Sequence, residues 1–241
     1  SASSATPEEG LKQYSAHSFN KAIQEAWDGK DAMSRLVTGL SYLEKLRLAK
    51  DKLSRDSAKA QSRKHLAKLE SEVTVRDAET IGMFIGVPGN PDGNEAAKEL
   101  LKKALSKARK HPDDILLAAK FVDPAKGQDV CKTALTVVAG LLGKARREIG
   151  KGSPMPREMQ DLFQKQELVA PIVSVLEDRK LAPYARDCLA TIEEPALKHM
   201  DDKPLTPALS EAIAVINTAK QRRLGKHPDS TWFSIDGRQA Q

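Results

Sequence analysis

Basic side chains gather in four stretches of the chain, and the chemistry open to such groups is the binding of a negatively charged partner. The predicted contact residues for a polyanion or an acidic protein are Lys50, Lys52, Arg55, Lys59, Arg63, Lys64, Lys102, Lys103, Lys107, Arg146, Arg147, Arg222 and Arg223. If these side chains met on one face, they could hold phosphates or an acidic protein groove. The alternative is that they are the solvated sides of helices. No aromatic residues are interleaved with them, so a surface that reads bases by stacking is not expected.

The other residue types that carry out chemistry are not arranged for it. None of the five histidines lies near another His or a Cys at metal-ligand spacing. Cys131 and Cys188 fall in apolar patterns, which predicts two core residues and favours a reducing intracellular compartment. The glycine-rich stretch at 86–94 lacks the Gly-Lys-Ser/Thr ending of a phosphate loop. We therefore predict no catalytic, metal or cofactor site, and a protein that is not an enzyme.

Two acidic pairs, Glu193–Glu194 and Asp201–Asp202, are the remaining candidates for acid–base chemistry, which needs one carboxyl group with a raised pKa. Each pair comes shortly before a proline, Pro195 or Pro204. Proline and acidic residues both suit the first turn of a helix. The sequence therefore favours capping of helix N-termini over catalysis for these carboxylates.

Composition indicates an all-α protein with a hydrophobic core. Of 241 residues, 40% are hydrophobic and 30% are charged, but only 4% are aromatic. The core must therefore consist of Leu, Ile, Val and Ala, which suits packed helices. The net charge of +6 is compatible with an anionic partner without requiring one. The longest apolar stretch, 135–143, is too short to form a transmembrane segment.

Breaks in the apolar pattern divide the chain into five segments. We predict a flexible leader at 1–13, a helical N-terminal subdomain at 14–85, a Gly/Pro linker at 86–94, a helical-repeat domain at 95–224 and a C-terminal tail at 225–241. The linker packs three glycines and two prolines into nine residues, which favours turns. The helix after the linker is expected to be capped by Asn94. A strongly apolar helix at 130–149 is expected to be central.

Prolines recur at a spacing of 12 in the C-terminal half, and one earlier pair has the same spacing. The later prolines are Pro171, Pro183, Pro195 and Pro207, and the earlier pair is Pro112 and Pro124. Proline suits the first turn of a helix and disrupts a helix interior. The spacing therefore predicts short helices, each opened by a proline and joined to the next by a short connection.

The stretch LVAPIVSVLEDRKLAPYARDCLATIEEPAL, residues 168–197, resembles HEAT and armadillo repeats. The shared features are an apolar first helix, an acidic turn at Glu177 and Asp178, and a second helix with the run YARDCLATI. In that family an Ala-Arg pair in the second helix is followed by small and aliphatic core residues, which here are Ala185, Arg186, Leu189 and Ile192. A looser copy at 115–142 has Asp123 in its turn.

The resemblance covers part of the C-terminal half and implies a specific architecture. We expect a helical bundle in the N-terminal part, followed by a short HEAT/armadillo-like, right-handed stack of antiparallel helix pairs. The alternative is an irregular helical bundle whose helices begin with proline by ordinary preference.

Three functions are compatible with this sequence. Repeat stacks expose one long face, so the leading hypothesis is a non-catalytic protein–protein interaction module or adaptor with a protein partner. The alternatives are nucleic-acid or other polyanion binding through the basic stretches, and a secreted or translocated bacterial helical protein. In the tail, Trp232, Phe233 and Ile235 are expected to pack onto the last repeat or, alternatively, to contact a partner. The oligomeric state is left open.

Overall fold

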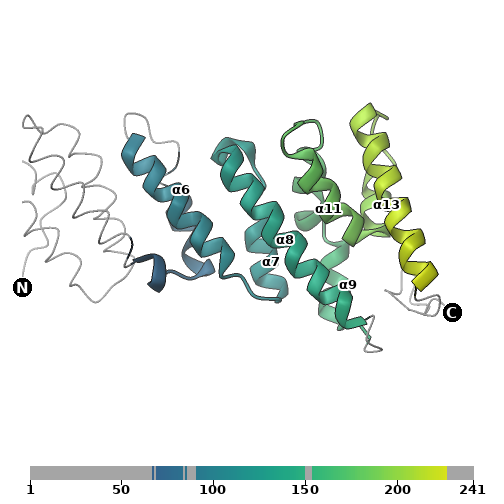
Figure 1. Cartoon of the computed structure of the whole chain (residues 1–241), viewed down its shortest axis with the longest axis horizontal. Helices are drawn as coiled ribbons and strands as arrows, with labels where there is room; N and C mark the ends of the chain where they lie inside the picture. Colours follow the sequence, from purple (N-terminus) through teal and green to yellow (C-terminus); the bar gives the residue numbers. More distant parts are fainter. Residues whose placement is uncertain (1–66, 68, 84, 86–90, 150–153, 227–241) are drawn as a thin grey trace, which may run out of the picture. The chain divides into compact units, whose positions relative to one another are not determined.

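Helices are the only regular elements among the residues that the structure describes (Figure 1). The computed structural model describes residues 67, 69–83, 85, 91–149 and 154–226. Most of the N-terminal subdomain predicted at 14–85 lies outside these ranges, as does nearly all of the tail. Contacts divide the chain into two compact units, Ser1–Ala104 and Leu105–Gln241. The all-α prediction is confirmed for the described residues.

The described part of the first unit contains the end of a helix at 69–72, two short helices and most of a long one. The 3-10 helix η1 (Val75–Asp77) leads directly into α5 (Ala78–Gly82). At the start of η1, the Thr74 N–H donates to the Asp77 carboxylate at 2.8 Å, which satisfies a backbone donor that the helix leaves unpaired. Helix α6 (Pro91–Ser106) ends just beyond the last residue of this unit.

The beginning of α6 corrects the predicted linker. Residues 86–94 were expected to form a turn-rich connection ending at a capping Asn94, but Pro91–Asn94 belong to the helix. Pro91 is the first helical residue, where its fixed φ and missing N–H carry no penalty. Asn94 therefore lies inside the first turn and does not cap it.

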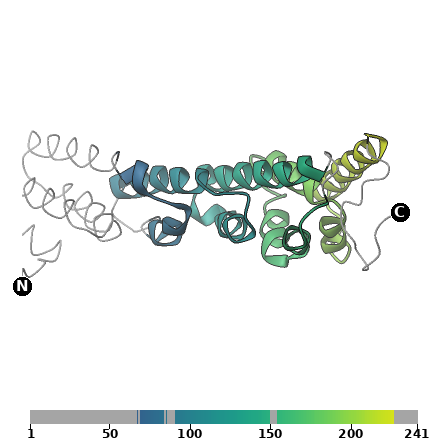
Figure 2. The same ribbon diagram turned by 90° about the horizontal axis from the view of Figure 1, so that it is seen from below.

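The second unit consists of two layers of helices (Figure 2). Its elements are α7 (Pro112–Ala119), η2 (Pro124–Lys126), α8 (Gln128–Ile149), α9 (Arg157–Gln164), α10 (Gln166–Ser174), α11 (Ala182–Ile192), α12 (Glu194–Met200) and α13 (Pro207–Lys226). The long-helix layer is α8, α11 and α13, in which α11 contacts both neighbours. The short-helix layer is α7, α9, α10 and α12. Across the layers, α7 packs on α8, α10 on α11 and α12 on α13.

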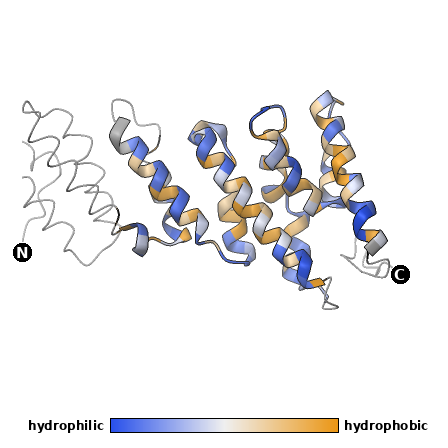
Figure 3. Cartoon of the chain, viewed as in Figure 1, coloured by the Kyte–Doolittle hydropathy of each residue, from blue (hydrophilic) through white to orange (hydrophobic). Residues whose placement is uncertain are grey.

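Apolar residues at helical spacing build the core between the two layers. On α8, Val130, Leu135, Val138 and Leu142 are all buried, which confirms the predicted central helix. Cys131 and Cys188 are buried and free, as expected of small core residues. Each helix also carries hydrophilic residues, which Figure 3 shows beside the hydrophobic ones. This pattern is expected of helices that are buried on one side only.

Most of the predicted helix starts are confirmed, and two are wrong. The prolines found in the first two positions of an element are Pro112, Pro124, Pro183, Pro195 and Pro207. Pro171 instead lies inside α10, because only Lys165 separates α9 from α10 and the helix already begins at Gln166. No described helix begins at Pro204 either, because the Thr206 hydroxyl caps α13 by accepting from the Leu209 N–H at 3.1 Å.

Polar contacts join the beginnings of the three long helices. Asp178, in the turn before α11, accepts hydrogen bonds from the Lys180 N–H at 2.9 Å and from the Gln128 side chain of α8 at 2.9 Å. Its neighbour Glu177 accepts from the Thr206 hydroxyl at the start of α13 at 2.6 Å. The three helices therefore begin at one edge of the long-helix layer and run parallel. The specific HEAT/armadillo-like, right-handed stack stays a prediction.

Candidate functional site

A buried ion cluster lies where the three long helices end. The Glu193 side chain is 1% exposed, and the Nε of Arg223 lies 2.8 and 3.1 Å from its two oxygens. The Nη2 of Arg146 lies 3.2 Å from the same carboxylate. The Nη1 of Arg146 also donates to the Ala190 carbonyl at 3.3 Å. One carboxylate thus connects α8, α11 and α13 at their C-terminal edge.

The backbone holds Glu193 in place between two helices. Its N–H donates to the Leu189 carbonyl at 2.9 Å and so ends α11, while its own carbonyl accepts from the Ala196 N–H at 3.0 Å and so begins α12. Its φ of 63° and ψ of −118° are strained for a residue with a side chain. The surrounding hydrogen bonds and the two arginines maintain this conformation. The carboxylate therefore does not cap α12, contrary to the sequence prediction.

The groups around Arg146 shift its pKa in opposite directions. Burial lowers the pKa of Arg146, the Glu193 carboxylate raises it, and the nearby Arg223 lowers it again. A guanidinium group nevertheless stays protonated in proteins, so both arginines carry their charge. Next to the cluster, Lys220 of α13 forms an ion pair with Glu194, the first residue of α12.

Two further arginines lie beside the cluster and are exposed. Arg147 follows Arg146 in the last turn of α8, and Arg222 precedes Arg223 near the end of α13. Both side chains are exposed, and neither forms an ion pair within the described ranges. We use "arginine edge" for Arg146, Arg147, Arg222 and Arg223 with Glu193.

The exposed side of the long-helix layer carries acidic groups nearer the helix beginnings. Asp129 lies in the first turn of α8, Asp187 is in the middle of α11, and both are exposed. Glu211 of α13 is exposed and lies 3.6 Å from the Arg186 guanidinium of α11. Lys132 of α8 lies over the Tyr184 ring at 4.9 Å. This surface is therefore mixed in charge and becomes positive at the arginine edge.

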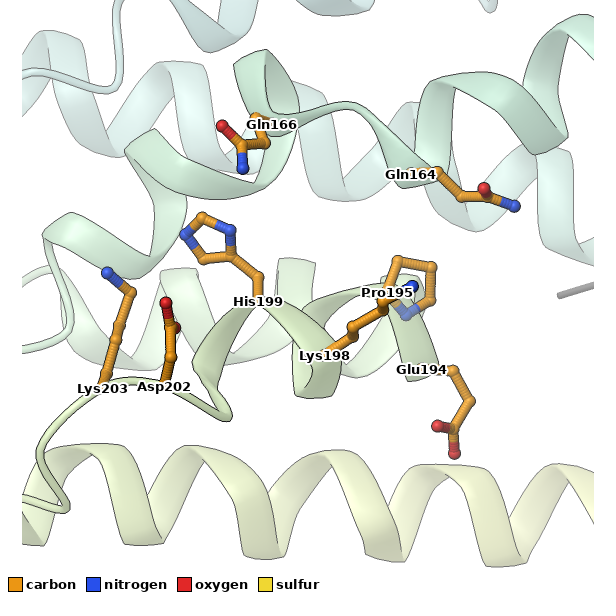
Figure 4. A pocket seen from close by; sticks show the side chains of 8 residues that line it. All are labelled: Gln164, Gln166, Glu194, Pro195, Lys198, His199, Asp202 and Lys203. Carbon is orange, nitrogen blue, oxygen red and sulfur yellow. The ribbon is translucent and has the colours of Figure 1, made fainter.

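A polar cleft lies in the short-helix layer (Figure 4). Its volume is about 400 Å³, and it is lined by Gln164, Gln166, Glu194, Pro195, Lys198, His199, Asp202 and Lys203. The side chains of His199, Asp202 and Lys203 extend toward α10, whereas Glu194 extends toward α13. Partial burial lowers the pKa of His199, the cationic Lys203 lowers it further, and Asp202 raises it. The lining supplies no thiol or hydroxyl nucleophile, and its amide, imidazole and ammonium groups suit hydrogen bonding to a polar group.

The structure brings together two of the four basic stretches predicted from the sequence. Arg146 and Arg223, far apart in the chain, reach the same Glu193 oxygen. Lys102 lies on α6, where it pairs with Glu99 at 2.6 Å, and Lys103 is exposed on the same helix. Lys107 follows α6 and is exposed. The predicted contacts Lys50, Lys52, Arg55, Lys59, Arg63, Lys64, Trp232, Phe233 and Ile235 lie outside the described residues.

Sequence reasoning missed the carboxylate that organises the arginine edge. Glu193 stands in a Glu-Glu-Pro sequence typical of a helix start, and nothing in that sequence signals a positive φ at a glutamate. The signal that could have pointed to a buried carboxylate was the pair of Arg-Arg dipeptides, each near a predicted helix end. An arginine that becomes buried needs an anionic partner. The cleft residues Lys198, His199 and Lys203 are close in sequence, but their cleft depends on α10 packing against α12.

Among the described residues, no group of three His, Cys, Asp or Glu side chains is placed to hold a metal ion. None of the described helices combines the length and the apolar character needed to cross a membrane. Comparisons with protein-family models, curated proteins and solved structures find no match to this chain.

Proposed function

We propose that the chain is a non-catalytic protein-interaction module that presents the exposed side of the long-helix layer to a protein partner. The observation that carries this proposal is the asymmetry of that layer. Its inner side is buried against the short helices, whereas Thr136 and Gly140 of α8 and Asp187 of α11 are exposed on its other side. Parallel helices held side by side form a rigid, extended surface, which suits recognition of another protein.

The turns of the second unit support a HEAT/armadillo-like stack as the basis of this function. Asp123, between α7 and α8, accepts from the Ala125 N–H at 3.0 Å. Asp178, between α10 and α11, accepts from the Lys180 N–H at 2.9 Å in the same way. Two successive helix pairs thus use an aspartate at the equivalent turn. Ala185, Leu189 and Ile192 are buried at the positions where that family carries core residues.

The charge pattern favours a protein partner over a nucleic acid. A nucleic-acid backbone carries regularly spaced negative charges and binds best along a continuous positive track. Here Asp129, Asp187 and Glu211 interrupt the exposed side of the layer. Tyr184 is the only aromatic residue in the described ranges that is not buried, and Lys132 already lies over its ring. A protein surface with charges of both signs complements this pattern better.

Site-specific photo-crosslinking in cells that make the protein tests the proposal. A benzophenone amino acid replaces Gly140 or Asp187 on the exposed side of the long-helix layer, or Asp161 on α9 as the control. A Cβ atom at Gly140 meets nothing within 4 Å, so there is room for a side chain to begin there. We expect the same protein adduct from Gly140 and Asp187 and none from Asp161. An absence of adducts at the first two positions, or identical adducts at all three, would contradict the proposal.

A further inference from the structure

The arginine edge has the properties of a docking point for a specific kind of segment. Resting on the proposed function, we infer that the partner contributes a short, extended acidic segment. The segment lies across the C-terminal end of α11, with one acidic group on Arg147 of α8 and another on Arg222 of α13.

Helix geometry separates the two arginines of each pair into different roles. Successive residues of an α-helix are rotated by about 100° around its axis. Because Arg146 points toward Glu193, Arg147 is turned away from the cluster, and it is exposed. The same rotation separates Arg223, whose side chain is 11% exposed, from the exposed Arg222. The inner arginines hold the three helices together, and the outer ones are available to a ligand.

The net charge of the arginine edge favours binding of an anion, although the negative ends of three helix dipoles lie there. Each helix C-terminus carries about half a negative charge, and three long helices end here. The arginine edge contains four guanidinium groups and one carboxylate, so it has three net positive charges. These outweigh the helix dipoles. Lys220 adds nothing to this balance, because it is paired with Glu194.

The spacing of the helices sets the length of the segment. Packed helices lie about 8–10 Å apart, so the axes of α8 and α13, with α11 between them, are separated by about 16–20 Å. An extended chain advances about 3.3 Å per residue. A segment of about five residues therefore reaches from one arginine to the other. Between them, the last turn of α11 offers only the small side chains Ala190 and Thr191, so a backbone can approach closely.

The surroundings limit the ligand to a short segment. Asp187 lies about one turn before the end of α11, and Glu211 lies toward the beginning of α13. A longer polyanion that continued toward the helix beginnings would meet these carboxylates. The outer arginines are also positioned before binding, because the buried cluster fixes α8 and α13 relative to α11. Such preorganisation lowers the entropic cost of association.

Fluorescence anisotropy with the full-length chain at low ionic strength tests this inference. The probe is a fluorescein-labelled peptide with paired glutamates at each end and a Ser-Gly-Ser centre, and the control probe carries glutamines instead. We expect the glutamate peptide to bind and the glutamine peptide not to bind. The double variant R147E/R222E is expected to weaken binding by about tenfold or more, because two charge-assisted contacts become repulsive.

The matched control is R179E/K180E, which makes the same charge change in the turn before α11, at the opposite edge of the layer. Retained binding in this variant and its loss in R147E/R222E would support the inference. Equal loss in both variants would show a net-charge effect and overturn it. Tighter, arginine-dependent binding of single-stranded DNA would overturn it in favour of a polyanion. Crosslinks at Gly140 and Asp187 without peptide binding would refute this inference alone and leave the proposed function standing.

Discussion

At the end of α11, Glu193 combines a φ of 63°, a side chain that is 1% exposed and contacts with two arginines. The backbone strain costs about 1–3 kcal/mol, and a buried charge is costly unless it is well paired. Both costs persist only because the neighbouring contacts offset them. The conformation of Glu193 therefore depends on the neighbouring helices α8 and α13, which supply the two arginines.

Removing the charge of Glu193 should leave two partly buried guanidinium groups without a counter-ion. We expect Glu193→Gln to lower the free energy of unfolding by about 3 kcal/mol. The control is Glu148→Gln, because Glu148 also pairs with a cation, Lys110, but its side chain is 51% exposed. This change should cost less than about 0.5 kcal/mol. Urea unfolding followed by circular dichroism measures both, and equal effects would refute the role of burial.

The two thiols should be inert in the folded protein. Burial, together with the nearby Asp123 and Asp178 carboxylates, raises the pKa of Cys131 to about 11. Burial likewise raises the pKa of Cys188, whose Sγ lies 3.2 Å from the Leu135 carbonyl oxygen. At about pH 8 almost no thiolate is present to react. We expect neither thiol to react with an aromatic disulfide reagent until denaturant is added, when both should react; rapid labelling of the native protein would contradict this burial.

At the scale of the residue, the sequence predicted which side chains would be buried but not the strained backbone conformation of Glu193. Apolar surroundings predicted that Cys131 and Cys188 would be buried, and the structure confirms it. The two Arg-Arg dipeptides indicated Arg146 and Arg223 as possible contacts for an anionic partner. Their common partner could not be found, because the conformation of Glu193 depends on tertiary contacts with α8 and α13.

Helical elements were predictable wherever one strong local signal defined them. Helix α8 was expected at 130–149 and is found at Gln128–Ile149, because its buried residues repeat at helical spacing. The prediction at Pro171 was wrong because two signals compete there. Proline marks a helix start only when the preceding residues are not already helical, and α10 begins earlier, at Gln166. Which helices pack together into the two layers could not be predicted from the sequence.

Replacing either of two glycines in the long-helix region with alanine should change the free energy of unfolding, but in opposite directions. Gly140 lies within α8, and an added Cβ meets nothing within 4 Å. Gly140→Ala should therefore raise the free energy of unfolding by about 0.5–1 kcal/mol, because alanine favours the helix. Gly127, just before α8, has a φ of 104°, so Gly127→Ala should destabilise the protein. Thermal unfolding of both variants measures this, and a destabilising Gly140→Ala would contradict the open environment of that residue.

At the scale of the whole molecule, the chain divides after Ala104 into two compact units. The layers of the second unit bury their own apolar core, including Leu135, Phe163 and Leu189. A unit with its own core is expected to fold independently. We expect a fragment of residues 105–241 to be helical by circular dichroism and to unfold in a single cooperative thermal transition. A fragment without such a transition would show that this core depends on the first unit.

The ion cluster at the arginine edge also bears on how this unit can change in evolution. Stacked helix pairs often gain or lose a pair, because each pair contacts only its neighbours. Here Glu193 contacts arginines from α8 and α13, so a deletion of α12 and α13 would remove one of its two counter-ions. An insertion of a pair after α11 would separate the same charges. A change in the number of helix pairs at this point would therefore require a substitution at residue 193 as well.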